Sequence, residues 1–224
     1  MLRIPARRAF TLVELLTVIA IIGVLASILI PGTSKVRLKA QRMDSIANLR
    51  SLGVAVSLFT NDNKDKLPGP LSHTQYAFRK NGDTSQLSHW LADHTGFIVK
   101  PDDPVSILGH KRFFSQYGHD LTHYTAYITN QKVYIGGQSG NSPWGWSGAA
   151  SGDIKRIPKQ LHTLDTPSRA LALMEVDQEL LTDTTAKASG QSPEKPLFDD
   201  GRAALFFDWH VKVVPFSVKL GNNK

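Results

Sequence analysis

A single acidic residue, Glu14, interrupts an apolar run near the beginning of the chain. The run extends from Leu12 to Ile30, reads LVELLTVIAIIGVLASILI, and contains no other charged residue. As a helix, a run of about twenty such residues crosses the hydrocarbon core of a bilayer, which is about 30 Å thick. A charge inside a spanning helix costs about 2.5 to 3.5 kcal/mol on insertion scales. We therefore expect Glu14 to have a partner, and an amine is the best candidate.

The residues that flank the run predict its orientation. Three arginines lie among the first eight residues, and their charge favours a cytoplasmic N-terminus. Basic residues after Pro31 favour the opposite orientation, but we expect the leader to decide. A cleaved secretory signal has a shorter apolar region, of about 7 to 15 residues, followed by small residues. Here residues 28–30 continue the run past Ala26 and Ser27, which predicts a retained membrane anchor.

A second helical pattern follows the apolar run. Apolar residues recur at intervals of three and four, as on one face of an amphipathic helix: Met43, Ile46, Leu49, Leu52, Val56 and Phe59. Pro31 and Gly32 predict a kink that does not end the helix. One helix is thus predicted from Phe10 to about Thr60, with a membrane-spanning segment over 10–31 and an amphipathic half over 32–62.

The rest of the chain, residues 63–224, has the pattern of a β-rich globular domain. Short runs with strand character are separated by turn residues, and they lie at 97–99, 125–128, 133–135, 170–174, 203–207 and 211–214. An antiparallel sheet packed on the amphipathic half of the helix would bury both apolar faces. Asp208 and Trp209 are expected to form a turn that closes a hairpin. The predicted fold class is α+β.

The start of the helix resembles a known signature. The stretch Ala9-Phe10-Thr11-Leu12-Val13-Glu14, with Pro31 at its end, resembles the N-terminal motif of type IV pilins and type II secretion pseudopilins. The resemblance covers about fifty residues of this chain. It implies that prepilin peptidase removes the leader 1–9 by cutting between Ala9 and Phe10, and that the new Phe10 amine is then N-methylated. Ala9 stands where the family usually has glycine, and we expect this departure to slow cleavage.

Elementary electrostatics gives Glu14 a role in such a protein. After cleavage, the Phe10 ammonium would lie at the apolar end of a helix bundle, where the Glu14 carboxylate of a neighbouring subunit would neutralise it. The resemblance implies a structural subunit without enzymatic activity, which enters a type II secretion pseudopilus or a pilus. Its partners would be the peptidase, other pilin-like subunits, the assembly platform and the bacterial inner membrane. The C-terminal domain would lie in the periplasm or on a surface filament.

Two C-terminal segments resemble a pseudopilin-like family whose tail motif is a histidine followed nine residues later by Asp-Gly. Residues 165–175 resemble its proline-led strand, and residues 205–211 resemble its closing hairpin. In this chain Phe198 stands at the histidine position and Trp209 at the glycine position. We therefore expect the fold of that family here, and not a function that depends on the histidine.

No cofactor is expected, although the sequence offers candidates for two kinds of metal site. The chain has no cysteine, which excludes disulfides and thiolate ligands. His119 and His123 have the spacing of zinc ligands on a helix, but no glutamate follows the first histidine as a hydrolytic site requires. The calcium candidates are Asp199, Asp200 and Asp208, and they do not form an EF-hand pattern. Ordinary turns explain them more simply.

Two tryptophans, Trp144 and Trp146, lie in a glycine-rich loop at 136–152. They are candidate contacts for a partner, or they belong to a loop that folds back over the sheet. Nucleic-acid binding is not predicted, because the excess of +7 charges lies in the leader and at 35–50, without an aromatic and basic patch elsewhere. Two alternatives stay open. One is a membrane-anchored periplasmic enzyme or binding domain that does not polymerise, and the other is an adhesin-like minor tip subunit.

Overall fold

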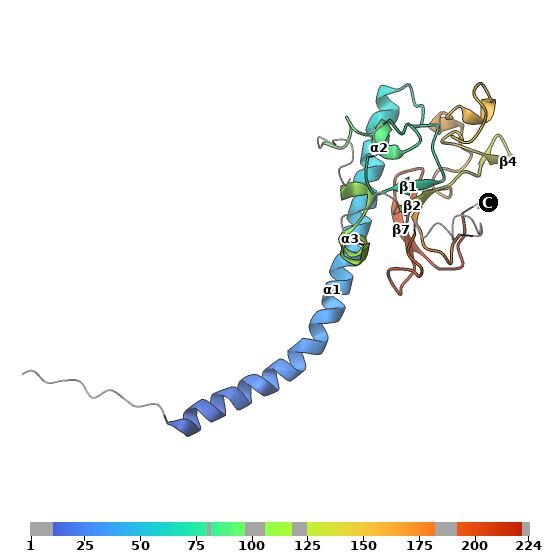
Figure 1. The fold of residues 1–224 in the computed structure, drawn as a ribbon. Helices are drawn as coiled ribbons and strands as arrows, with labels where there is room; N and C mark the ends of the chain where they lie inside the picture. The colour runs from blue at the N-terminus through green and yellow to red at the C-terminus, as the bar shows by residue number, and fades with distance from the viewer. Residues whose placement is uncertain (1–10, 80–81, 97–105, 118–124, 182–191, 221–224) are drawn as a thin grey trace, which may run out of the picture. The chain divides into compact units, whose positions relative to one another are not determined.

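The computed structural model describes residues 11–79, 82–96, 106–117, 125–181 and 192–220 (Figure 1). The chain divides into two units, Met1–Ala40 and Gln41–Lys224. The elements in chain order are α1 (Leu12–Asp62), β1 (Thr74–Tyr76), α2 (Leu87–Trp90), η1 (Ser106–Leu108), α3 (Lys111–Tyr117), β2 (Thr125–Thr129), β3 (Val133–Ile135), β4 (Gln138–Asn141), η2 (Ile154–Arg156), η3 (Leu161–Thr163), β5 (Leu171–Glu175), β6 (Arg202–Phe206) and β7 (Val211–Val214).

The helix α1 contributes residues to both units and is continuous through position 31. The prediction that Pro31 does not end the helix is therefore confirmed, and the kink at this residue stays a prediction. In the part of the chain that the structure describes, no helix combines the length and the apolarity that a membrane crossing requires.

The helix α1 ends close to the predicted position, and its last turn has a defined cap. Asn63 N–H donates to the carbonyl of Phe59 over 3.0 Å, and Asp65 N–H donates to that of Thr60 over 2.8 Å. Lys64 and Asp65 adopt φ values of 55° and 65°. A left-handed backbone after the last turn is the usual way to satisfy the final carbonyls of a helix, so the chain reverses here and enters the globular unit.

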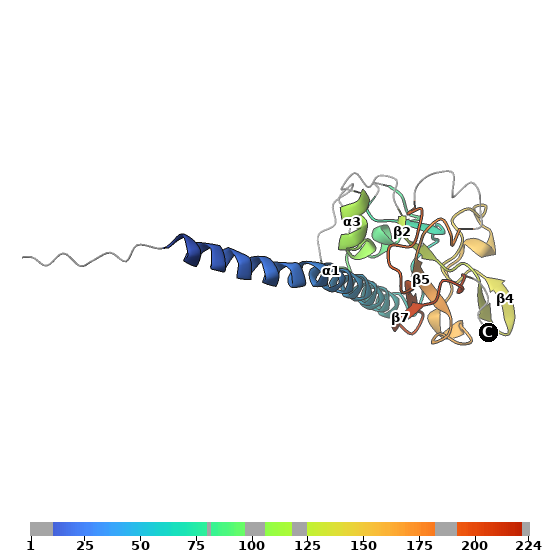
Figure 2. The ribbon, with the colours of Figure 1, turned by 90° about the horizontal axis from the view of Figure 1, so that it is seen from below.

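The globular unit is built on a five-stranded antiparallel sheet with the order β1-β2-β5-β6-β7. The strands β3 and β4 pair separately as a small hairpin, which lies apart from the main sheet in both views (Figures 1 and 2). Every residue of β2, β5 and β6 is buried. A sheet whose central strands are buried on both faces must be covered on both sides.

Two apolar clusters cover the two faces of the sheet. On one face, Leu49, Leu52 and Val56 of α1 pack with residues of β5 and β6 and with Phe207. Gly53 permits this approach, because a Cβ at this position would lie 3.0 Å from Cδ1 of Leu205. The opposite face holds a second cluster: Ile128, Leu171, Met174, Val176, Leu180, Leu181, Ala204, Phe206 and Val214. The predicted α+β class is confirmed, with a long N-terminal helix packed on a small antiparallel sheet.

Most of the predicted strands are present. The runs at 125–128, 133–135, 170–174, 203–207 and 211–214 correspond to β2, β3, β5, β6 and β7, whereas the run at 97–99 lies outside the described residues. The short strands β1 and β4 were not predicted, because TQY and QSGN carry no apolar alternation. The turn at Asp208 and Trp209 is confirmed, since Trp209 N–H donates to the carbonyl of Phe206 over 3.0 Å.

Candidate functional site

Apolar side chains are exposed on all sides of the first half of α1. The exposed fraction is 79% for Leu12 and 55% for Leu25. A helix that is apolar all round is normally buried, either in lipid or among other helices. The exposed set is Leu12, Val13, Leu15, Leu16, Val18, Ile19, Ile21, Ile22, Val24 and Leu25. This surface therefore requires a cover that the described residues of the first unit do not supply.

The hydroxyl groups of this segment are satisfied within the helix. Thr17 Oγ1 donates to the carbonyl of Glu14 over 2.9 Å, and Ser27 Oγ donates to that of Val24 over 2.7 Å. Back-bonding of this kind satisfies the hydroxyl donors of Thr17 and Ser27 within the helix. Such a surface can therefore be buried in lipid or among other helices, where no water is present.

Glu14 forms a reciprocal capping box with Thr11 at the start of α1. The Thr11 N–H and its Oγ1 both donate to Oε2 of Glu14 over 2.9 Å, and Glu14 N–H donates to Oγ1 of Thr11 over 3.2 Å. A threonine followed three residues later by glutamate is the sequence signature of this motif. The carboxylate thus has a local structural partner in addition to the predicted intermolecular amine, and pairing with that amine stays a prediction. Ala9 and Phe10 lie outside the described residues.

A buried ion-pair network lies between α1 and the sheet in the globular unit. Arg42 Nη1 donates to Oε2 of Glu175 over 2.7 Å, and Arg42 Nε donates to Oδ1 of Asp200 over 3.0 Å. The same guanidinium also donates to the carbonyl of Gly201. Burial alone would lower the pKa of Arg42, but the ion pairs with Asp200 and Glu175 outweigh it, and the pKa is raised. Arg42 therefore connects the helix to both β5 and the segment that precedes β6.

Glu175, the last residue of β5, accepts bonds from three residues of two elements, α1 and β6. Besides Arg42, the Ser45 hydroxyl of α1 donates to its Oε1, and the Ala203 N–H of β6 donates to its Oε2 over 2.7 Å. A buried carboxylate is tolerated only when it is paired and hydrogen-bonded. Both oxygens of Glu175 meet this condition.

Phe198 lies over the guanidinium of Arg42. The distance from Arg42 Cζ to the ring centroid is 4.1 Å, and Arg112 Cζ lies 5.5 Å from the same ring. Stacked guanidinium groups are attracted by the electron-rich face of an aromatic ring. Phe198 at the histidine position of the tail motif is thus a packing residue of the Arg42 network. Trp209, at the glycine position, has a φ of 68°, the left-handed backbone that glycine adopts most readily.

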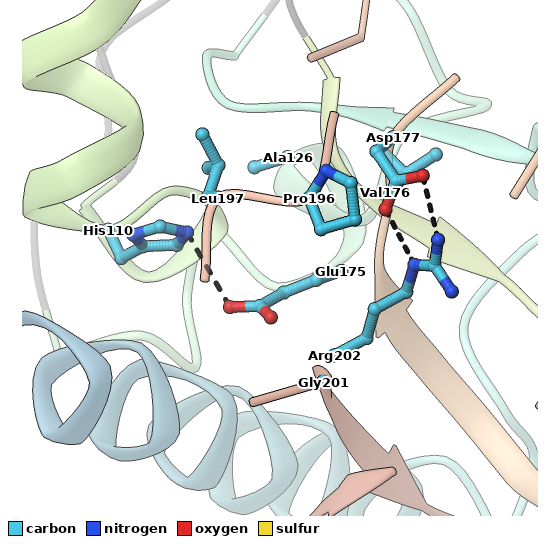
Figure 3. A pocket seen from close by; sticks show the side chains of 9 residues that line it. All are labelled: His110, Ala126, Glu175, Val176, Asp177, Pro196, Leu197, Gly201 and Arg202. Atoms are coloured by element: carbon cyan, nitrogen blue, oxygen red, sulfur yellow. Dashed lines mark hydrogen bonds and ion pairs between the residues drawn. The ribbon is translucent and has the colours of Figure 1, made fainter. Parts of the chain in front are cut away.

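A second buried ion pair joins Asp177 to Arg202, beside a small cavity (Figure 3). Arg202 Nη2 donates to Oδ1 of Asp177 over 2.8 Å. The cavity has a volume of about 10 Å³ and is lined by His110, Ala126, Glu175, Val176, Asp177, Pro196, Leu197, Gly201 and Arg202. A volume of this order accommodates about one water molecule. The cavity is therefore too small for an organic substrate.

His110 faces Glu175 across this cavity. Its Nδ1 accepts a bond from Phe113 N–H at 3.4 Å, whereas its Nε2 lies 3.6 Å from Oε1 of Glu175 and has no hydrogen-bond partner among the described residues. Burial lowers the pKa of His110, and Arg42 and Arg112 act in the same direction, although Glu175 and Asp44 oppose them. His110 is therefore neutral in the folded protein near pH 7.

This burial predicts a loss of stability in mild acid. Unfolded His110 takes up a proton near its ordinary pKa of 6.5, whereas the folded form resists protonation. The free energy of unfolding should therefore be constant above about pH 6.5 and fall below it, by at most about 1.4 kcal/mol per pH unit for one proton. Urea unfolding at pH 7.5 and 5.5, followed by tryptophan fluorescence, measures this difference.

The matched variants for this prediction are His110→Asn and His210→Asn. His110→Asn should reduce the difference between the two pH values, because the buried imidazole is absent. His210, an exposed residue whose Nδ1 lies 2.6 Å from Oδ1 of Asp208, serves as the control, and its variant should keep the wild-type difference. Equal pH dependence in wild type and His110→Asn would contradict the prediction.

Two of the three calcium candidates are engaged in protein contacts. Asp200 binds Arg42, and Asp208 contacts His210. Within the described ranges, no group of three or more histidine and carboxylate side chains is arranged to hold a metal ion. The calcium hypothesis stays a prediction. His119 and His123 lie outside the described residues.

The two tryptophans of the glycine-rich loop differ in exposure, and Trp144 follows the alternative of a loop that folds back over the sheet. Trp144 is fully buried, with an exposed fraction of 0%, and its ring packs on Phe207 at a centroid distance of 5.1 Å. The loop folds back onto the core because burial of the large indole surface is favourable. Trp146, which is 48% exposed, remains available at the surface.

The sequence pattern alone predicts no site at Arg42, which stands in a basic cluster. This residue nevertheless lies four positions before Ile46 and seven before Leu49, on the stripe that the helix buries. A cation on an apolar stripe requires a buried carboxylate partner. Glu175, at the end of the apolar run LALM, was the available signal for that partner.

The N-terminal segment matches known proteins. A family model described as the prokaryotic N-terminal methylation motif matches residues 4–30. The type IV major pilin protein PilA of Myxococcus xanthus is 40% identical over 62 residues, which are 28% of this chain and 28% of that protein. The type II secretion system core protein G of Pectobacterium carotovorum is 39% identical over 57 residues, which are 25% of this chain and 36% of that protein.

A longer match extends into the globular unit. The type II secretion system core protein G of Klebsiella michiganensis is 34% identical over 104 residues, which are 46% of this chain and 71% of that protein. The chain thus spans 28% and 36% of the first two relatives and a much larger share of this third one. No solved structure matches the chain. With the methylation motif, the capped apolar helix and this coverage, the chain belongs to the family of type IV pilins and type II secretion pseudopilins.

Proposed function

We propose that this protein is a structural subunit of a type II secretion pseudopilus or a type IV pilus-like filament, which assembles through its N-terminal helix. The observation that carries the proposal is the apolar surface of residues 12–25, which is exposed on every side of α1. Neighbouring helices of the same kind would cover this surface in a filament, and lipid would cover it before assembly. The names of the matched relatives support the same class of protein.

The route to the filament follows from the N-terminal motif. The chain is inserted in the bacterial inner membrane through residues 10–31, with the C-terminal domain in the periplasm. Prepilin peptidase cuts between Ala9 and Phe10, and Phe10 is N-methylated. The assembly platform then transfers the mature subunit into the filament, where Glu14 pairs with the Phe10 amine of a neighbouring subunit.

The enzyme alternative requires a cleft in which histidines and acids converge. His110, Glu175 and Asp177 do converge, but around a cavity of about 10 Å³, and the two carboxylates are already bound by Arg42 and Arg202. This arrangement supports a structural role for the cluster. The tip-subunit alternative keeps one marker, the exposed Trp146, with the apolar side chains of Ile154 and Ile157 also exposed in this region of the chain.

Mass spectrometry of the N-terminus tests the proposed processing. Protein purified from membranes should begin at N-methylated Phe10. The variant Ala9→Gly restores the residue usual at this position and should increase the processed fraction at early times, severalfold if Ala9 slows the cut. An intact Met1, or a chain that begins near Ser27, would contradict the proposal.

A further inference from the structure

Three cations that follow the apolar segment, Lys35, Arg37 and Lys39, form an exposed cluster on α1 that we call the cationic collar. All three residues are exposed. No ion pair joins them to any residue that the structure describes. They contrast with Arg42, whose guanidinium is buried and bound to two carboxylates. The collar therefore has no counter-charge within the described part of the subunit.

The sequence of the helix offers the collar no acidic neighbour either. Between Glu14 and Asp44 the chain contains no aspartate or glutamate, so none of the three cations has an acid three or four residues away. Lys35 and Lys39 are themselves four residues apart, a spacing at which like charges repel and destabilise an isolated helix. Anionic groups outside the subunit would relieve this repulsion between the cations.

The positions of the cations around the helix indicate what that environment is. At 100° per residue, Lys35 and Lys39 lie on one side of α1 and Arg37 on the opposite side. A protein partner would engage one side of the helix. Lipid headgroups surround a membrane helix on all sides, so they can bind all three cations at once.

The distance along the helix agrees with this environment. Lys35 lies five residues after Ile30 and Lys39 nine residues after it, which corresponds to about 7 Å and about 13 Å of helix rise. The polar region of each leaflet is about 5 to 8 Å thick. Long cationic side chains extend back along the helix to reach such a layer.

We infer that the cationic collar binds the headgroups of anionic phospholipids on the periplasmic face of the inner membrane. The inference rests on the proposed insertion of residues 10–31. The collar would hold the subunit at a fixed depth before assembly, and it would make the release of the subunit from the membrane dependent on lipid charge and on salt.

The full-length protein, purified in detergent, tests the inference by partition into vesicles. Vesicles of phosphatidylcholine alone are compared with vesicles that contain 30 mol% phosphatidylglycerol, and bound protein is measured by flotation. Each cation near an anionic surface strengthens binding about fivefold, so the anionic vesicles should bind wild type more tightly, on the order of a hundred-fold. Most of this preference should disappear in 0.5 M NaCl, where the Debye length is about 4 Å.

Two triple variants with the same net charge distinguish binding by the cationic collar from a general effect of the protein's charge. Lys35→Gln, Arg37→Gln and Lys39→Gln together should abolish most of the preference for anionic vesicles. The control combines Lys155→Gln, Lys212→Gln and Lys219→Gln, which are exposed cations of the globular unit, and it should retain the wild-type preference.

The outcomes separate this inference from the proposed function. Equal binding of wild type to both kinds of vesicle would overturn the collar inference and leave membrane insertion intact. Failure to bind either kind would overturn the insertion itself. A collar variant that keeps the lipid preference but no longer forms filaments would also overturn the inference, because it would assign the collar to an acidic surface of another subunit.

Discussion

Replacing Glu14 with glutamine is expected to abolish entry into filaments while membrane insertion and leader removal continue. Glutamine can keep the capping box with Thr11, because an amide oxygen at this position accepts the same bonds. It cannot neutralise the Phe10 amine of a neighbouring subunit. A buried charge left without its partner costs about 3 to 5 kcal/mol, so filament yield should fall by roughly a hundred-fold or more. The assembled fraction is measured by immunoblotting of sheared filaments.

The variant Thr11→Val separates the two roles of Glu14. It removes the hydroxyl half of the capping box and keeps the carboxylate. The loss of a cap costs about 0.5 to 2 kcal/mol of local helix stability, and assembly should persist because the charge remains. Wild-type yield from Glu14→Gln would refute the pairing. A loss of assembly only in Thr11→Val would assign the function to the cap.

Replacing Arg42 with methionine should strongly destabilise the globular unit. It leaves the buried carboxylate of Glu175 without its cation and removes the contact between α1 and Asp200. Breaking a buried pair in this way costs about 3 to 5 kcal/mol, a large part of the 5 to 15 kcal/mol by which folded domains are usually stable. Urea unfolding of the full chain, followed by the fluorescence of buried Trp144, measures the loss.

Two further variants complete this experiment. Arg42→Met combined with Glu175→Gln should recover part of the loss, because no bare charge then remains at the centre of the network. Arg50→Met, at an exposed position of the same helix, should change the free energy of unfolding by less than about 0.5 kcal/mol. Equal effects of Arg42→Met and Arg50→Met would show that the network does not hold α1 to the sheet.

The extent of α1 and the pairing of β6 with β7 could be predicted from the sequence because both depend on local signals. The helical spacing from Met43 to Phe59 and the caps around Asn63 are visible in the residues themselves. The same is true of the turn at Asp208. The order of the strands in the sheet depends on contacts between distant parts of the chain. The same holds for strand β1, whose sequence TQY is polar. The spacing of apolar residues along the sequence contains no information about such contacts.

Of the two groups of site residues, the sequence predicted the one around Glu14 and not the one around Arg42. The capping box and the apolar run lie within twenty residues, so Glu14 could be identified directly. The network around Arg42 joins residues that are 133 and 158 positions apart, and no local pattern connects them. For Trp144 the sequence left exposure and burial open, because the contact of its ring with Phe207 joins distant parts of the chain.

The capping box has a consequence for the kinetics of polymer growth. Two bonds from Thr11 orient the carboxylate of Glu14. In the proposed pairing, an incoming amine would therefore meet an oriented acceptor, and little side-chain entropy would be lost when the two charges meet. The carboxylate would also keep a hydrogen-bond donor while the subunit enters the filament, because the Phe10 amine of the neighbouring subunit could replace a Thr11 donor. Each step of filament growth would then exchange a Thr11 donor for the incoming amine, at a carboxylate that is already oriented.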